Sequence, residues 1–364
     1  MHDQTARQGS TGAILDHIVL GLCRPLDRLR STMYRQLMPL IEGLIANREQ
    51  RVALTGCAVI LSSLTIALAC PLWQLALGPI LFGTAHILAD VRYCVVRPGF
   101  HRRWPLMLCC GLPLGAMVLG YGLDIGLMAV AFAFALAQGP VWKKITGLLA
   151  VALAAAGIAE YGFFADVVFA HLHNVVAVLL WWAWRKRGDR LHWIVLAVYL
   201  GTWTALLSGV LDNVYLSLQS AAWGPEQMDM LYHANFLGFG LGGMESVRWV
   251  LAFAMAQSVH YWMWLRMVPE DDRKQYTPRS FRATWTALGL DMGSLFLWLT
   301  LLTALGTAVW AAFDLLEART GYLRFVRFHG VLELAAGALL WVEGRETLLG
   351  MTRVSSPPSP ARLG

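Results

Sequence analysis

Residues 52–69 read VALTGCAVILSSLTIALA, a run of 18 residues without one charged side chain. A helix that crosses about 30 Å of hydrocarbon needs roughly 20 mostly apolar residues, so a run of this length predicts a transmembrane helix. Nine further runs of comparable character lie at 72–95, 105–122, 124–140, 144–161, 163–184, 191–210, 245–267, 285–310 and 324–342. The sequence therefore predicts an all-α fold, a polytopic transmembrane helical bundle of about 8–10 spans.

The composition of the whole chain points the same way. The 364 residues are 57% hydrophobic and only 14% charged, with a mean hydropathy of +0.54. A soluble chain of this length needs far more polar surface, so an ordinary soluble enzyme is excluded. The six cysteines include no C-x-x-C pair, which excludes a disulfide scaffold and gives no zinc-site spacing.

The positions of the Lys and Arg residues predict how the chain is oriented in the membrane. The net charge is +6, and the Lys and Arg residues fall in short clusters between the apolar runs. With the N-terminus inside, all but four of the 29 basic residues lie on the cytoplasmic side, the exceptions being Arg248, Arg319, Arg324 and Arg327. This asymmetry predicts a multi-pass protein of a bacterial-type inner membrane with both termini cytoplasmic. It also accounts for the net charge without a nucleic-acid partner.

Three segments follow from this layout. Residues 1–50 form a cytoplasmic amphipathic segment, because Ile14, Ile18 and Leu22 recur at helical spacing and a cluster of arginines follows. Residues 51–345 form the transmembrane domain. Residues 346–364 contain a Ser/Pro-rich stretch and are predicted to be a disordered cytoplasmic tail.

Two groups of residues are interpreted as surface features. Five tryptophans fall at the predicted cytoplasmic ends of spans, where aromatic side chains anchor a protein at the interface: Trp181, Trp182, Trp184, Trp262 and Trp264. The charged segment 270–272 follows Pro269 and is predicted to be a solvated cluster.

Histidines and carboxylates inside the predicted spans are the candidate functional residues, since such groups are costly in hydrocarbon and usually face the bundle interior. The metal-ligand candidates are His86, His171, His173, His260 and His329, and the catalytic candidates are Asp90 and Glu333. His86 and Asp90 are four residues apart, as are His329 and Glu333. Each pair therefore shares one helix face.

Helix periodicity separates two adjacent candidates. His171 and His173 are two residues apart, so a regular helix points their side chains roughly 200° apart. Only one of them faces a shared centre, and His173 is favoured because Asp166 lies seven residues earlier on the same face. His260 supplies a fourth helix, together with Gln257. Straight helices place these residues at different depths, so the sequence permits one central site or two.

The donor types select the chemistry. Imidazole and carboxylate ligands without thiolate favour non-haem iron, while copper, zinc and a haem b with two axial histidines remain alternatives. The carboxylates can equally act by orienting the imidazoles. A set of His–carboxylate hydrogen bonds that only holds helices together is the structural alternative.

The segment Gly83-x-x-His86-x-x-x-Asp90, with an isolated His260 in an aromatic membrane helix, resembles the membrane-embedded Brp/Blh-type β-carotene dioxygenases. Those enzymes carry a Pro-His-Gly-Ala-x-Asp type motif, and Ala85 stands where that family has proline. The resemblance implies that His86 and His260 are iron ligands, that Asp90 orients His86, and that the substrate is a carotenoid.

The sequence thus predicts a membrane metalloprotein, a non-haem iron oxygenase or related oxidoreductase. Its partners are expected to be the lipid bilayer, a lipophilic small-molecule substrate such as a carotenoid, isoprenoid or acyl chain, and an electron donor. Two other functions remain open: a haem-b electron-transfer subunit, and a proton-coupled transporter that uses the same histidines and carboxylates.

Overall fold

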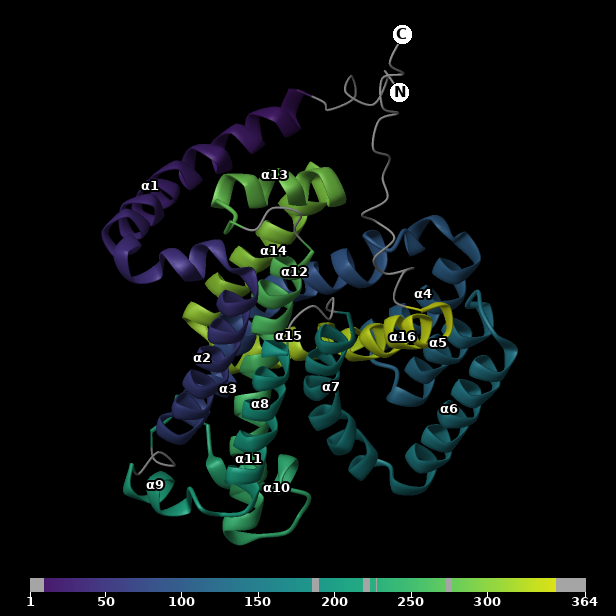
Figure 1. Ribbon diagram of the computed structural model, residues 1–364. Coiled ribbons are helices and arrows are strands. Elements are labelled where there is room, and N and C mark those ends of the chain that lie inside the picture. Colours follow the sequence, from purple (N-terminus) through teal and green to yellow (C-terminus); the bar gives the residue numbers. More distant parts are fainter. Residues whose placement is uncertain (1–9, 185–189, 219–222, 227, 273–276, 345–364) are drawn as a thin grey trace.

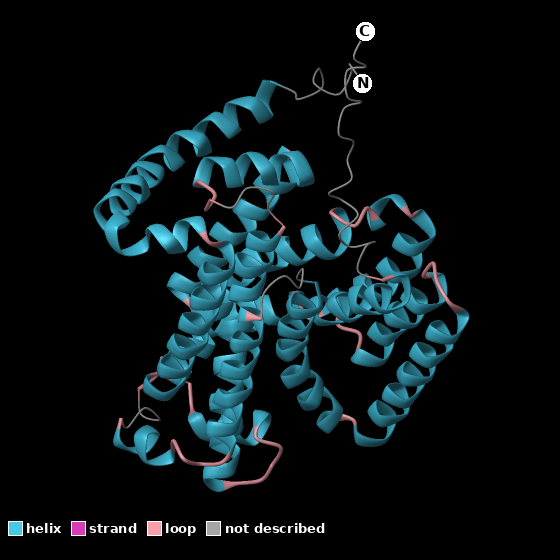
Figure 2. Cartoon of the chain, in the orientation of Figure 1, coloured by secondary structure: helices cyan, strands magenta, loops and turns pink. Residues whose placement is uncertain are grey.

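A computed structural model describes residues 10–184, 190–218, 223–226, 228–272 and 277–344. Every regular element within these ranges is a helix (Figure 2). The predicted all-α fold is therefore confirmed for the described chain. The predicted tail at 346–364 lies outside these residues.

The elements follow one another as Figure 1 labels them. The first half contains α1 (Ser10–Ala46), α2 (Arg48–Ala69), α3 (Pro71–Asp90), η1 (Val91–Val96), η2 (Phe100–Arg102), α4 (Trp104–Val118), α5 (Leu123–Leu136), α6 (Val141–Tyr161) and α7 (Phe163–Trp184). The second half contains α8 (Leu191–Leu207), α9 (Asp212–Ser217), α10 (Met230–Leu237), α11 (Gly243–Trp262), η4 (Met263–Met267), α12 (Val268–Asp271), α13 (Phe281–Met292), α14 (Ser294–Phe313), α15 (Leu315–Phe325) and α16 (Phe328–Glu343).

Six helical segments of the described chain are long and apolar enough to cross a membrane: Arg48–Ala69, Pro71–Val96, Val141–Tyr161, Phe163–Ala183, Ser294–Phe313 and Leu315–Glu343. Only 6% of the apolar window is buried within the protein in both α6 and α14. Large side chains such as Leu295, Leu302 and Phe313 stand exposed along α14. Apolar surface of this extent is stable against lipid rather than water, so these helices indicate a membrane protein.

The predicted run 285–310 is not one helix. Gly293 has a φ of 81°, and it divides the run into α13 and α14. α13 lies beside α1 at one end of the bundle (Figure 1). There Asp27 accepts hydrogen bonds from the backbone N–H groups of Phe281 and Arg282, and Asp16 accepts one from Trp285. These polar contacts explain why the chain turns before α14 begins.

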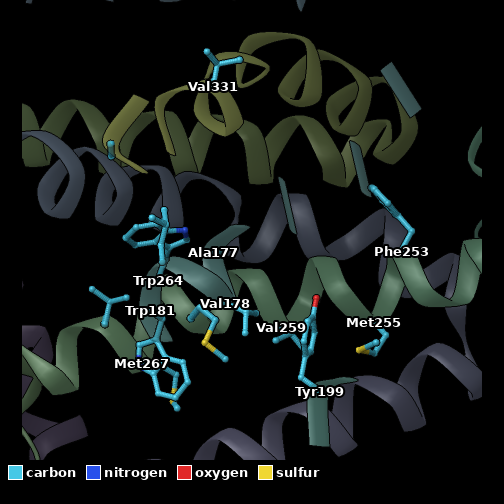
Figure 3. Packing of buried hydrophobic residues seen from close by; sticks show 14 of the residues in the cluster. Ala177, Val178, Trp181, Tyr199, Phe253, Met255, Val259, Trp264, Met267 and Val331 are labelled. Atoms are coloured by element: carbon cyan, nitrogen blue, oxygen red, sulfur yellow. The ribbon is translucent and has the colours of Figure 1, made fainter. Parts of the chain in front are cut away.

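The core of the bundle surrounds α11, which packs against α2, α3, α7, α8 and α10. Figure 3 shows part of this core, including Met255, Val259 and two tryptophans. Trp181 is 1% exposed and Trp264 is fully buried, so the prediction that they anchor the protein at the interface is wrong. Each has a carboxylate acceptor inside the protein: Trp181 donates to Asp271, and Trp264 donates to Glu333.

The 270–272 segment is also not simply solvated. Glu270 is 2% exposed, and its carboxylate accepts hydrogen bonds from Arg51 and Arg266. Arg51 itself is largely buried at the start of α2. The prediction failed because the partner of Glu270 lies more than 200 residues away in the sequence. This ion pair ties α2 to α12.

Candidate metal centre

Four histidines from four helices form one cluster, which we call the histidine cluster: His86 of α3, His173 of α7, His260 of α11 and His329 of α16. The ring centroid of His260 lies 5.3 Å from those of His86 and His173 and 5.6 Å from that of His329. His329 lies 5.1 Å from His86 and 5.3 Å from His173. The structure thus brings these four residues into one place rather than two.

Asp90 joins the cluster one helical turn after His86. Donor atoms of His86, Asp90, His260 and His329 all lie within 4.8 Å of one another, close enough to share one metal ion. Asp90 is fully buried, and neither of its carboxylate oxygens has a hydrogen-bond partner among the described residues. The same is true of His86 Nε2 and of both ring nitrogens of His260. Buried polar atoms are rarely left in this state, so these orphaned donors and acceptors point to a ligand.

The helix backbone orients three of the imidazoles. The Nδ1 atoms of His86 and His173 lie 3.3 and 3.4 Å from the carbonyl oxygens of Phe82 and Phe169, one turn earlier. His329 Nδ1 lies 2.6 Å from the Val326 carbonyl oxygen. A hydrogen bond at Nδ1 fixes the tautomer in which Nε2 carries the free lone pair. Nε2 is therefore the atom that each of these rings offers to the centre.

A second polar layer lies beside the histidines and contains Asp90, Trp264 and Glu333. Trp264 Nε1 donates to Glu333 Oε1 at 2.5 Å, and the same oxygen lies 3.4 Å from His260 Nε2. Glu333 is fully buried, and its Oε2 has no hydrogen-bond partner among the described residues. Trp264 was not predicted as a site residue, although it follows His260 by one turn and so shares its face.

Two segments that adjoin this polar layer are π-helical rather than α-helical. The π-helical segment η1 begins directly after Asp90, and η4 begins directly after Trp262 and contains Trp264. π-helical turns are rare and occur frequently at functional sites. Their positions next to the two layers are consistent with such a site.

His171 does not join the cluster. Its ring lies among aromatic side chains, 5.3 Å from Phe239 and 5.2 Å from Trp249, and its Nε2 is 3.0 Å from the carbonyl oxygen of Leu237. The geometry therefore does not support His171 as a ligand of this centre. The physical reason is the helical periodicity of α7, which turns His171 away from the face that His173 occupies. Asp166 is exposed and is not among the converging donors.

Gly330 allows α16 to approach α7. A Cβ atom at this position would lie 3.1 Å from the Cβ of His173 and 2.9 Å from Cζ of Phe169. Gly83 plays the same part between α3 and α15, since a Cβ there would lie 2.3 Å from Cζ of Tyr322. The histidine cluster thus depends on two close helix contacts that a larger residue prevents.

We expect Gly330→Ala to weaken metal binding about tenfold, because the added methyl group pushes against His173 and displaces this candidate ligand. Gly337→Ala is the matched control on the same helix, since its Cβ would meet Leu180 at an ordinary 3.5 Å. Metal affinity measured by chelator competition checks the pair. Equal affinities for both variants would contradict this role of Gly330.

A cavity of about 510 Å³ borders the histidine cluster. Its walls come from α3, α4, α5, α7, α10, α11, α15 and α16, and they include His86, His173 and His329. Phenylalanines line part of the wall, namely Phe169, Phe236 and Phe253, and Arg319, Tyr261 and Tyr322 line another part. Pockets of about 300–1,000 Å³ are typical of small-molecule sites.

Comparison of this chain with protein-family models, with curated proteins and with solved structures found no match. The site's chemistry is therefore inferred from its own geometry.

Proposed function

We propose that this chain is an integral membrane metalloprotein whose metal ion is bound by His86, His173, His260 and His329, with Asp90 as a further donor. The observation that carries the proposal is the buried, unpartnered state of Asp90 beside converging imidazole nitrogens. A buried carboxylate without a compensating partner is strongly unfavourable. A divalent cation at this point supplies the missing partner for the carboxylate and for the ring nitrogens together.

Non-haem iron is the metal that we propose. The converging donors in the described chain are nitrogen and oxygen atoms, without a cysteine thiolate, and such sets suit iron held in an open coordination shell. A haem iron takes two axial ligands and needs a flat slot for its macrocycle. Three imidazoles and the Asp90 carboxylate whose donor atoms lie within 4.8 Å of one another, with the His173 ring beside them, support a non-haem site over haem b. Zinc and copper are distinguished from iron by the metal analysis described below.

The reaction that we propose is an oxidation or oxygenation of a lipid-soluble substrate. Iron would supply the binding and activation of dioxygen. The bordering cavity binds and positions the substrate, and its largely apolar wall excludes water from the centre. Glu333 holds or moves a proton at Oε2, and Trp264 fixes the other oxygen of that carboxylate. An external redox protein supplies electrons where the reaction needs them.

We propose further that the protein lies in a bacterial-type inner membrane with both termini cytoplasmic. This orientation rests on the distribution of Lys and Arg along the chain.

Metal analysis of the purified protein tests this function directly. The full chain, extracted in mild detergent and dialysed against buffer without chelator, is expected to retain about one equivalent of iron per chain. Electron paramagnetic resonance of its nitric oxide adduct is expected to report non-haem ferrous iron, and the optical absorption spectrum is expected to lack porphyrin bands. Less than about a tenth of an equivalent of any transition metal, also after reconstitution with ferrous iron, would contradict the proposal.

A further inference from the structure

The cavity beside the histidine cluster is lined by three arginines. They are among the four basic residues that do not follow the charge asymmetry of the chain. They are Arg319 and Arg324 of α15 and Arg327, which precedes α16. They lie within or beside a segment apolar enough to span a membrane, Leu315–Glu343. Arginines in such segments are rare, and they commonly mark the path of a charged ligand.

These three guanidinium groups have no carboxylate partner among the described residues. Arg319 donates from Nε to the carbonyl oxygen of Leu75, which leaves its terminal nitrogens for another acceptor. Neither Arg324 nor Arg327 forms an ion pair with any residue that the structure describes. The fourth exception, Arg248, behaves differently, because its Nη2 lies 2.6 Å from Asp212 Oδ2 outside this cavity. The unpaired positive charge is thus gathered at the cavity.

The acidic side chains near the cavity do not cancel this charge. Asp166 is the one acidic residue among the lining residues that the structure describes. Against it stand the three arginines. His233 adds no donor to the cavity, because its Nδ1 lies 2.8 Å from the Asp229 carbonyl oxygen and therefore carries the proton, which leaves Nε2 with a lone pair. The lining therefore carries an excess of donors.

We infer that this cavity binds an amphipathic lipid with an oxyanion end group, the simplest example being a long-chain carboxylate. The guanidinium fork of Arg319 matches a carboxylate in a bidentate manner, and such charge-assisted hydrogen bonds are strongest where water is excluded. The chain of the ligand lies against Phe169, Phe236 and Phe253 and brings an apolar segment to the histidine cluster. The inference rests on the proposed function, since it names the substrate class of that same centre.

A wholly apolar hydrocarbon fits this cavity less well. It fills the volume between the phenylalanines, but it leaves the terminal guanidinium nitrogens of Arg319 without an acceptor. Leaving such groups unpaired is what makes a polar site reject an apolar analogue. The carboxylate end group is therefore the feature that distinguishes the ligand.

Binding to the full chain in lipid nanodiscs tests this inference, with radiolabelled dodecanoate and dodecanol as the two probes. The measurement is made at a pH at which dodecanoate is ionised, and wild-type protein is expected to prefer dodecanoate at least about tenfold. Arg319→Gln retains a donor for the Leu75 carbonyl oxygen, and it is expected to weaken dodecanoate binding about tenfold while dodecanol binding is unchanged. Arg248→Gln is the matched control, and it is expected to bind both probes as the wild type does.

A second variant covers the case in which Arg319→Gln does not fold. Arg324 and Arg327 have exposed side chains, so the double variant Arg324→Gln/Arg327→Gln is expected to fold and to lose preference for dodecanoate. Equal binding of the two probes by the wild type, or an unchanged preference in the folded arginine variants, would overturn the inference.

Metal content, measured on every variant, separates the two proposals. Protein that holds metal but shows no preference for dodecanoate contradicts the inference alone. Protein that prefers dodecanoate through Arg319 but holds no metal contradicts the proposed function alone.

Discussion

His260→Ala is expected to lower the metal affinity by more than about a hundredfold, a larger effect than the 10–100-fold typical when an outer-shell partner of a metal ligand is removed. The ring centroid of His260 lies within 5.6 Å of those of the other three histidines of the cluster, and its Nε2 lies 3.4 Å from Oε1 of Glu333. Its loss removes one donor and leaves Asp90 facing an incomplete site. Metal analysis after purification, followed by chelator competition on the reconstituted protein, measures the effect.

His171→Ala is the matched control for this experiment. It removes the same imidazole from the same core, but the ring contacts Phe239 and Trp249 instead of the cluster. We expect this variant to keep its metal, even if it is less stable. A loss of metal from folded His171→Ala as large as that from His260→Ala would show that the cluster is not the binding site.

Glu270→Gln is expected to destabilise the protein by about 3–5 kcal/mol, the usual cost of removing one partner of a buried ion pair. The substitution removes the negative charge that faces the largely buried Arg51, and it replaces one of the two oxygens that accept from Arg51 and Arg266 with an amide NH2 group, which cannot accept. Thermal unfolding in detergent, at a fixed protein-to-detergent ratio, measures the change. Glu317→Gln, on an exposed side chain of α15, is the control and should change stability by less than about 0.5 kcal/mol.

The same carboxylate gives a pH dependence with a definite sign. Burial acts to raise the pKa of Glu270, but the hydrogen bond from Arg51 and the charge of Arg266 outweigh burial and lower the pKa below its ordinary 4.5. A group whose folded pKa is lowered contributes stability above its unfolded pKa, and that stability is lost as the pH falls through the folded value. Wild-type protein should therefore lose stability below about pH 4.5 more steeply than Glu270→Gln does. Parallel curves for the two proteins would contradict this assignment.

The sequence was sufficient for the all-α fold and for much of the candidate site. Uncharged runs such as 52–69 exceed the length that a span requires, and helical spacing placed Asp90 on the face of His86 and Glu333 on that of His329. The same periodicity separated His173 from His171. These inferences succeed because they depend on residues within one or two turns of each other.

The remaining features depend on contacts between distant segments. Straight helices put His86 and His329 at different depths. In the structure the helix is interrupted between α15 and α16, and the ring centroid of His329 lies 5.1 Å from that of His86. Nothing near Trp264 in the sequence shows that its acceptor is Glu333. The three arginines of the cavity did leave a signal, because they were exceptions to the charge asymmetry, but the asymmetry alone does not say what they face.

Because the histidine cluster draws one ligand from each of four helices, the order of biosynthesis constrains when it can bind metal. His329 leaves the ribosome about 240 residues after His86, which is a delay on the order of 10–50 s at about 5–20 residues per second. During that interval the segment that carries Asp90 has been made, while the last imidazole has not. The proposed metal site can therefore be completed only after α16 has been made, and a chain that ends before α16 cannot form it.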